Sequence, residues 1–222
     1  MLKFLILDLD ETLYPRDAGL MQEIGVRINR YLIDHLHLSE VDAVLLRQRY
    51  FLQYGTALRG LIVERSDANP EDYLQFVHDI QLTKYIAPNP ALNDMLRSID
   101  LTKVIFTNST REHAQKVLGI LGIADCFSRI IDIRAIEYIS KPDRRAYEKM
   151  LELLEARPDE CILVEDSARN LVPAKALGLK TILVDSIECD EVDYCVKDIL
   201  EVKDAVDKWV QVASNKQQDQ KR

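Results

Sequence analysis

The sequence of 222 residues has few of the features that mark disordered or membrane-bound proteins. It contains only 7 glycines and 7 prolines, and 47% of its residues are hydrophobic, which predicts an ordered, helix-rich globular protein. No hydrophobic run approaches the length that crosses a bilayer, and the N-terminal apolar run is too short for a signal peptide. We therefore expect a cytoplasmic protein that does not associate with membranes.

Cysteine and net positive charge are also scarce. The cysteines include no CxxC pair, which favours reduced thiols over a disulfide framework; they are Cys126, Cys161, Cys189 and Cys195. The net charge is −8 and the pI is near 5.1, whereas binding to a nucleic acid polymer needs a basic surface. Any phosphorylated partner is therefore expected to be a small metabolite.

Short apolar runs rich in β-branched residues alternate with stretches that have helical periodicity. The strand-like runs lie at residues 3–7, 103–106, 129–133, 161–164 and 181–184. The helical stretches between and before the later runs lie at residues 91–99, 111–121, 144–154 and 168–177. This alternation predicts an α/β fold, with a Rossmann-like parallel sheet flanked by helices.

The region between the first and second predicted strands contains no strand-like run. Apolar residues spaced three or four apart predict an amphipathic helix from about residue 21, and Ser39 and Asn69 are expected to cap further helices. The tail after residue 212 is polar and is expected to be frayed. We therefore expect an α/β core at residues 1–13 and 87–212, a helical cap domain at 14–86 and a flexible tail at 213–222.

Polar side chains follow three of the predicted strands, at the sheet edge where α/β proteins bind ligands. They are Asp8 and Asp10, Thr107 and Asn108, and Glu165 and Asp166. Each pair alone has an ordinary alternative role in a turn or helix cap. Together the carboxylates would repel one another unless a cation shares the site, and an all-oxygen donor set predicts Mg²⁺.

Two features predict that a phosphate group binds beside this metal. The backbone N–H groups at the start of the helix after Asn108 favour an anion, and Lys141 supplies a positive charge. Magnesium usually completes its coordination with water and substrate phosphate. The predicted site therefore suits a phosphate monoester.

Four segments, "LILDLDETL", "VIFTNS", "SKPD" and "LVEDS", occur in the order in which the haloacid dehalogenase superfamily carries its motifs, and the chain resembles that superfamily. The resemblance implies that Asp8 is a nucleophile that forms an aspartyl-phosphate. It implies that Asp10 is the general acid and base, and that Lys141 neutralises charge. Thr107 and Asn108 correspond to the residues that orient the phosphate.

The same resemblance implies how Mg²⁺ is held. The ligands would be the carboxylates of Asp8 and Asp166 and the backbone carbonyl of Asp10, with Glu165 in the outer shell acting through a water. The helical insertion lies where the family has its cap domain, which closes over the site and excludes bulk water. The presence of Asp10 favours phosphoryl transfer over dehalogenation.

One stretch of the insertion, "YGTALRGL" at residues 54–61, resembles the cap of pyrimidine 5'-nucleotidases. In this interpretation Tyr54, Thr56 and Arg59 determine specificity: Tyr54 stacks on a base and Arg59 contacts base or phosphate oxygens. The alternative is a glycine-bounded turn that joins two cap helices.

The sequence therefore predicts a Mg²⁺-dependent phosphomonoester hydrolase that acts on a nucleoside 5'-monophosphate, with a pyrimidine as the preferred base. A sugar-phosphate mutase of the same superfamily and a non-catalytic nucleotide-binding relative remain as alternatives. The histidines fall in no motif and are expected to be surface or packing residues; they are His35, His37, His78 and His113. No oligomeric state is predicted.

Overall fold

The computed structural model describes residues 1–184 and 190–219. In this part of the chain, six parallel strands form one sheet in the order β3-β2-β1-β4-β5-β6. The strands are β1 (Phe4–Leu7), β2 (Thr102–Phe106), β3 (Arg129–Ile131), β4 (Cys161–Glu165), β5 (Lys180–Val184) and β6 (Tyr194–Val196). The predicted α/β fold with a parallel sheet is confirmed, and β6 is a strand that the sequence patterns did not predict.

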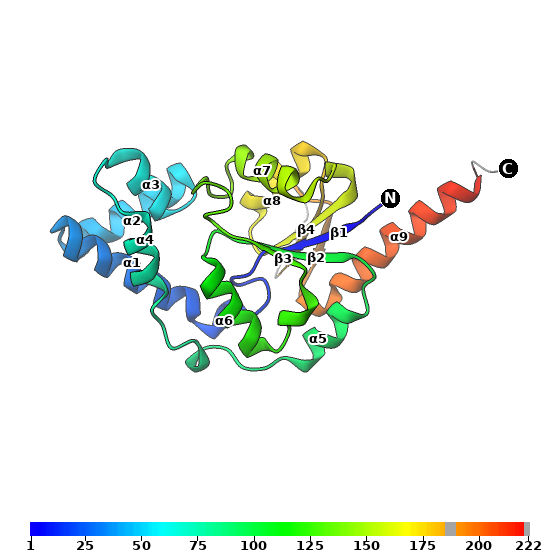
Figure 1. Ribbon diagram of the computed structural model, residues 1–222, viewed down its shortest axis with the longest axis horizontal. Coiled ribbons are helices and arrows are strands. Elements are labelled where there is room, and N and C mark those ends of the chain that lie inside the picture. Colours follow the sequence, from blue (N-terminus) through cyan, green and yellow to red (C-terminus); the bar gives the residue numbers. More distant parts are fainter. Residues whose placement is uncertain (185–189, 220–222) are drawn as a thin grey trace.

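Helices cover both faces of the sheet (Figure 1). One face packs against α5 (Pro90–Arg97), α6 (Arg111–Leu121) and α9 (Val202–Asp219), and the other against α7 (Arg144–Leu154) and α8 (Ala168–Leu177). Successive residues of β1 alternate between the two layers: Leu5 and Leu7 belong to the first, and Ile6 belongs to the second. Both faces are buried, which explains the continuous apolar runs of these strands.

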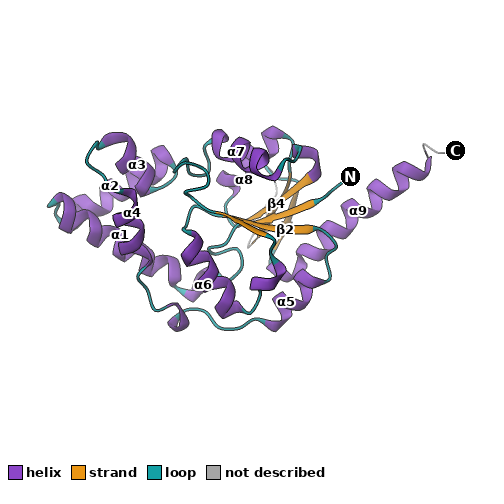
Figure 2. Ribbon diagram, in the orientation of Figure 1, coloured by secondary structure: helices purple, strands orange, loops and turns teal. Residues whose placement is uncertain are grey.

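The segment between β1 and β2 is helical, as predicted (Figure 2). It contains α1 (Leu20–Leu36), α2 (Glu40–Tyr54), α3 (Ala57–Glu64) and α4 (Pro70–His78). The side chain of Ser39 accepts a hydrogen bond from the backbone N–H of Asp42, and that of Asn69 from Glu71, so both predicted caps form. We refer to residues 14–86 as the insertion; it lies beyond the carboxyl ends of the strands.

The insertion contacts the core closely where α2 ends. Gly55 has φ of +90°, and a Cβ at this position would lie 2.4 Å from the carbonyl oxygen of Lys141. Beside it, the Ser140 hydroxyl donates to the Tyr54 carbonyl at 3.1 Å. Only glycine combines this backbone conformation with so close an approach, so Gly55 fixes the insertion directly onto the Lys141 loop.

A second connection is an ion pair between α4 and the loop after β3. Arg134 donates to both carboxylate oxygens of Glu71, with Nε–Oε1 at 2.9 Å and Nη2–Oε2 at 2.7 Å. The Tyr138 hydroxyl also donates to Glu71, at 2.6 Å. These bonds lower the pKa of Glu71 to about 2.

One expectation was wrong and another stays a prediction. The helix α9 continues to Asp219 and so includes residues 213–219, while the flexibility expected for the tail at 213–222 stays a prediction. Cys126 and Cys161 are free as predicted, whereas Cys195 is disulfide-bonded; Cys189 lies outside the described residues. Among the described helices, none is long and apolar enough to cross a membrane.

Candidate active site

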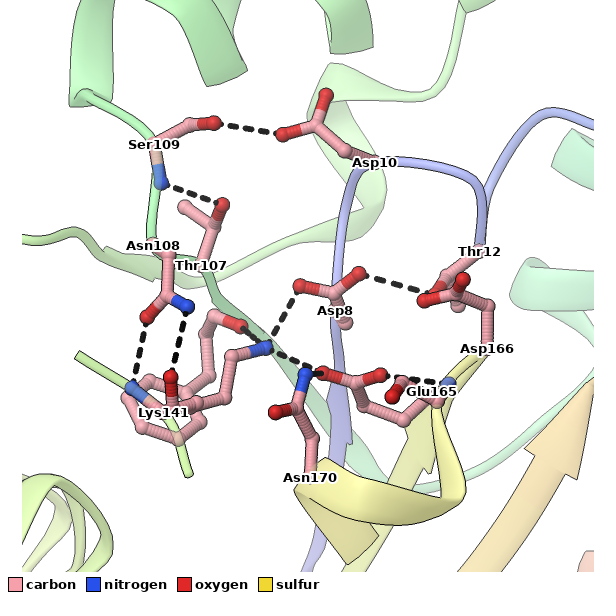
Figure 3. A network of polar contacts seen from close by, with 12 residues as sticks. Asp8, Asp10, Thr12, Thr107, Asn108, Ser109, Lys141, Glu165, Asp166 and Asn170 are labelled. Carbon is pink, nitrogen blue, oxygen red and sulfur yellow. Dashed lines mark hydrogen bonds and ion pairs between the residues drawn. The ribbon is translucent and has the colours of Figure 1, made fainter. Parts of the chain in front are cut away.

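The site forms where β1, β2 and β4 end side by side (Figure 3). Because β1 lies between the other two strands in parallel register, Leu7 pairs with Ile105 of β2 and with Val164 of β4. The residues that follow these positions therefore meet at one sheet edge. In this way, the structure brings Asp8, Thr107 and Glu165 together from three distant parts of the sequence.

Lys141 lies at the centre of this cluster and only 1% of its side chain is exposed. Its Nζ donates to Asp8 Oδ1 at 2.7 Å, to Glu165 Oε1 at 2.8 Å and to the Phe106 carbonyl at 3.0 Å. All three ammonium protons are therefore used. Burial by itself would lower the pKa of Lys141, but the charges of Asp8 and Glu165 outweigh it and raise that pKa above its ordinary value.

Asn108 holds the loop that carries this lysine. Its side-chain oxygen accepts from the Lys141 backbone N–H at 2.9 Å, and its Nδ2 donates to the Lys141 carbonyl at 3.2 Å. Thr107 is buried, and its hydroxyl oxygen accepts from the Ser109 N–H at 3.0 Å, which leaves the hydroxyl proton available to a ligand. Asn108 thus positions Lys141, while Thr107 presents a donor beside Asp8.

The cluster around Lys141 contains more acidic groups than positive charges. Burial raises the pKa of Asp8 to about 7, and the nearby charges of Glu165 and Asp10 add to this effect, while Lys141 opposes it. Burial and neighbouring carboxylates also raise the pKa values of Glu165 and Asp166. A further cation at this place would relieve the cost of ionising these carboxylates.

The oxygens of Asp8, Glu165 and Asp166 fit such a cation, because one ligand atom from each lies within 4.8 Å of the others. An all-carboxylate donor set of this kind suits Mg²⁺. Glu165 is the most occupied of the three, since it also accepts from Asn170 Nδ2 at 2.6 Å and from the Ser167 N–H at 2.9 Å. Asp8 and Asp166 are therefore the better candidates for direct ligands.

Arg16 approaches this cluster from the insertion. Its Nη2 lies 2.8 Å from Asp166 Oδ2, and its Nε lies 3.2 Å from Glu11 Oε2. Glu11 has φ of 62° and only 18% of its side chain exposed. Arg16 thus carries positive charge at the edge of the acidic cluster.

Asp10 has different surroundings from Asp8, although the two lie two residues apart. Its Oδ1 accepts from Tyr14 Oη at 2.7 Å and from His113 Nε2 at 3.0 Å, and its Oδ2 accepts from Ser109 Oγ at 2.6 Å. Burial by itself would raise the pKa of Asp10, but His113 and these hydrogen bonds outweigh it and hold that pKa well below its ordinary range. Figure 3 shows the Asp10 carboxylate directed toward Ser109 and away from Lys141.

A cavity of about 640 Å³ lies above these residues, between the core and the insertion. Its core side contains the polar residues already described. Its insertion side is largely apolar, and it is lined there by Met21, Ile24, Phe51, Leu58, Tyr73 and Val77. Arg47 of α2 also lines the cavity; its Nε is buried without a hydrogen-bond partner, and no carboxylate in the described part of the chain pairs with it.

Of the three predicted specificity residues, only Thr56 lines this cavity. Tyr54 and Arg59 line a separate hollow, and the Tyr54 hydroxyl donates to Glu64 at 3.0 Å. The reason is that the stretch predicted to be a loop or turn is the helix α3, whose first turn Thr56 caps by accepting from the Arg59 N–H. Leu58 faces the cavity, and Arg59 is turned about 100° further round the helix. The structure therefore places Tyr54 and Arg59 outside this cavity and Thr56 at its wall.

Sequence reasoning also missed residues that the structure places at the site. They are Tyr14, Arg16, Arg47, Ser109 and His113. Ser109 is the last residue of "VIFTNS", Tyr14 directly follows "LILDLDETL", and His113 lies in the first turn of the helix after "TNS", so proximity to the motifs was an available signal. For Arg47 no sequence signal was available, because its position depends on how α2 packs.

Comparison with known proteins decides the family. The model for haloacid dehalogenase-like hydrolases matches residues 2–178, which include four of the six strands, β1 to β4, and helices from both faces of the sheet. This chain belongs to the haloacid dehalogenase-like hydrolase family. The family match covers the insertion as well as the motifs around Asp8, Lys141 and Glu165.

Two curated proteins are similar to this hydrolase at 26% and 28% identity. Phosphate metabolism protein 8 of Saccharomyces cerevisiae is 26% identical over 213 residues, which is 88% of this chain and 66% of that protein. Pyrophosphatase PpaX of Halalkalibacterium halodurans is 28% identical over 109 residues, 46% of this chain and 50% of PpaX. The chain thus spans just under two thirds of the yeast protein and half of PpaX.

Among solved structures, CbbY from Rhodobacter sphaeroides in complex with phosphate has a similar fold. The TM-score is 0.64 at 16% sequence identity, and the superposition covers 91% of this chain and 96% of CbbY. This similarity establishes the fold of the hydrolase and not its substrate.

Proposed function

We propose that this hydrolase is a Mg²⁺-dependent phosphatase that acts on a small phosphate monoester through an aspartyl-phosphate intermediate. The observation that carries the proposal is the buried triad of Asp8, Lys141 and Glu165 at the base of the cavity, with Lys141 Nζ at 2.7 Å from Asp8. A carboxylate oriented by a buried ammonium at a cavity floor is suited to nucleophilic attack on phosphorus.

In the first step, an oxygen of Asp8 forms a bond to phosphorus while the bond from phosphorus to the substrate alcohol breaks. For this step Asp10 must carry a proton, which the negative charge of a bound phosphate favours against the hydrogen bonds that lower the pKa of Asp10. Asp10 donates this proton to the departing oxygen, so a neutral alcohol leaves. Lys141 and Thr107 lie beside Asp8 and offset or hydrogen-bond the charge on the phosphoryl oxygens.

In the second step, water attacks the aspartyl-phosphate and the bond between phosphorus and Asp8 breaks. Asp10, now ionised, accepts the proton of this water, and inorganic phosphate is released with Asp8 restored. Asp8, Asp166 and the backbone carbonyl of Asp10 would hold Mg²⁺, with Glu165 in the outer shell. When bound, the metal ion neutralises charge on the phosphoryl group.

For the substrate, we propose a nucleoside 5'-monophosphate, with a pyrimidine preferred. The insertion side of the cavity supports this preference, because Phe51 and Tyr73 offer aromatic surface to a planar base. The guanidinium of Arg47, whose Nε has no hydrogen-bond partner among the described residues, suits the exocyclic oxygens of a pyrimidine. Arg47 thus supplies the group that the sequence led us to expect at Arg59.

The names of the relatives support phosphate chemistry but differ in substrate. One is named a phosphate metabolism protein and the other a pyrophosphatase. Inorganic pyrophosphate therefore belongs among the substrates to be tested.

The test is release of inorganic phosphate by the purified protein from UMP, CMP, AMP, GMP, a hexose phosphate and pyrophosphate. We expect release with Mg²⁺, loss of release with EDTA and the highest kcat/KM with UMP or CMP. Phosphorus NMR would separate the mutase alternative, which predicts an isomeric sugar phosphate and little free phosphate. Binding of a nucleotide without turnover under any metal would contradict the proposed activity.

A further inference from the structure

Asp10 is held by hydrogen-bond donors on both of its carboxylate oxygens. Oδ1 accepts from Tyr14 and from His113, whereas Oδ2 accepts from Ser109 alone. A hydroxyl can reverse its role from donor to acceptor by rotating, so Ser109 can accept a proton carried by Oδ2. The arrangement therefore makes Oδ2 the oxygen on which Asp10 can carry a proton without losing a partner.

His113 is the least adaptable of the three donors. It lies in the first turn of α6 with 2% of its surface exposed, and the Thr110 hydroxyl accepts from its backbone N–H at 3.2 Å. Its Nε2 lies 3.0 Å from Asp10 Oδ1, and an ionised carboxylate can only accept, so Nε2 carries the shared proton. A rigid ring on a buried helix turn fixes the direction of this bond.

The other ring nitrogen of His113, Nδ1, also indicates that the ring proton lies on Nε2. Nδ1 is buried and has no hydrogen-bond partner among the described residues. A proton there would be a buried donor without an acceptor, which places the ring proton at Nε2.

The insertion covers His113 from above. The ring of His78, at the end of α4, lies with its centroid 4.5 Å from that of His113 and is inclined to it by 31°. The Nδ1 of His78 lies 3.0 Å from the Leu74 carbonyl, which fixes the His78 ring. Burial lowers the pKa of His78 to about 3, so an uncharged ring packs on His113 near neutral pH.

We propose that His113 is a positioning residue that holds the Asp10 carboxylate in the orientation required for proton transfer to the leaving group, with His78 of the insertion keeping the His113 ring in place. The inference rests on the proposed phosphoryl transfer. It adds a residue that does not touch the substrate and that acts through the general acid.

The decisive measurement is the dependence of kcat/KM on the leaving group. An alkyl alcohol needs a proton as it departs, whereas p-nitrophenolate is stable without one, so only esters of the first kind depend on Asp10 as an acid. We expect His113→Leu to lower kcat/KM for UMP by about tenfold or more and to change it for p-nitrophenyl phosphate by less than about threefold. Asp10→Asn removes the acid itself, so it gives the largest difference expected between the losses of kcat/KM for the two esters.

His113→Gln is the matched control, because its side-chain amide can place an N–H near the position of Nε2. We expect His113→Gln to keep most of the wild-type ratio of kcat/KM for UMP to kcat/KM for p-nitrophenyl phosphate. If His113→Leu does not fold, as judged by its melting temperature, His113→Asn replaces it, since Asn is polar but too short to reach Asp10. Equal losses on both esters, or a glutamine variant no better than leucine, would overturn the positioning role.

The two proposals fail in different ways. A wild-type protein that releases no phosphate from any ester contradicts the proposed function. An active wild-type protein whose His113 variants keep the same ratio of kcat/KM values contradicts only the inference about His113.

Discussion

The two sides of the cavity are built in opposite ways. The core side contains buried charged groups that hydrogen-bond to one another, as Lys141 does with Asp8 and Glu165. The insertion side consists mainly of apolar side chains on helices, together with Arg47, whose Nε has no hydrogen-bond partner in the described part of the chain. The core side comes from strand ends, and the insertion side from helix surfaces.

This difference leads us to expect that the core side carries out the reaction and that the insertion side selects the substrate. Removing one partner of a buried ion pair leaves an uncompensated charge and costs roughly 3–5 kcal/mol, so the core side tolerates little change. An apolar helix surface can change one side chain at a smaller cost, because no buried charge is left alone. We therefore expect substitutions on the core side to abolish activity and those on the insertion side to redistribute it among substrates.

The largest effect is expected for Asp8→Asn. The amide has nearly the same shape but is not a nucleophile, so phosphate release from UMP should fall by at least about 10⁴-fold. Asp67→Asn is the control, because Asp67 is exposed and lies between α3 and α4. Substantial activity in Asp8→Asn would show that another group attacks phosphorus.

The next effect is expected for Arg47→Gln. Losing a charged hydrogen-bond donor to the base should raise KM for UMP by roughly tenfold, while KM for phenyl phosphate, which has no acceptor on its ring, stays within about twofold. Arg49→Gln is a matched control on the same helix, since Arg49 is paired with Glu64 at 2.6 Å outside the cavity. Equal changes in KM for UMP and for phenyl phosphate would show that Arg47 does not determine specificity for the base.

A smaller effect, on stability, is expected for Glu71→Gln in the connection between the insertion and the core. The pKa of Glu71 is lowered from 4.5 to about 2, chiefly by hydrogen bonds from Arg134 and Tyr138. A lowered pKa means that the folded state favours the ionised form, so this stabilisation is present above pH 4.5 and is lost as the pH falls toward 2.

Because the pair is partly exposed, we expect Glu71→Gln to lower the free energy of unfolding by about 0.5–1 kcal/mol at pH 7. Thermal unfolding at several pH values measures the difference from wild type, which should shrink below pH 4.5. Glu152→Gln, at an exposed position of α7, is the control. A difference that does not depend on pH would mean that the ion pair does not hold the insertion.

The smallest effects are expected for Tyr54→Phe and Arg59→Gln. Both side chains lie outside the cavity, so kcat/KM for UMP should stay within about twofold of wild type, in keeping with the small energies of exposed contacts. A selective loss of activity toward nucleotides in either variant would restore the roles that the sequence resemblance suggested.

The positions that the sequence predicted well share a physical basis. Asp8, Thr107 and Glu165 follow apolar strands, and in a parallel sheet the carboxyl ends of neighbouring strands must meet. The bounds of α6, α7 and α8 were predicted for a similar reason, because their periodicity and end residues are local signals. The short strand β6 lacks such a signal, since tertiary pairing with β5 defines it.

By itself, therefore, the sequence determined the α/β fold, the helical character of the insertion and the set of polar groups at the strand ends, because periodicity and strand order act locally. Only the tertiary structure decided which side chains of the insertion reach the cavity and what surrounds Asp10. A rotation of about 100° separates Leu58 from Arg59, and the contact of His113 with Asp10 joins residues far apart in the chain. Packing of helices against one another fixes such directions, and no local pattern in the sequence specifies them.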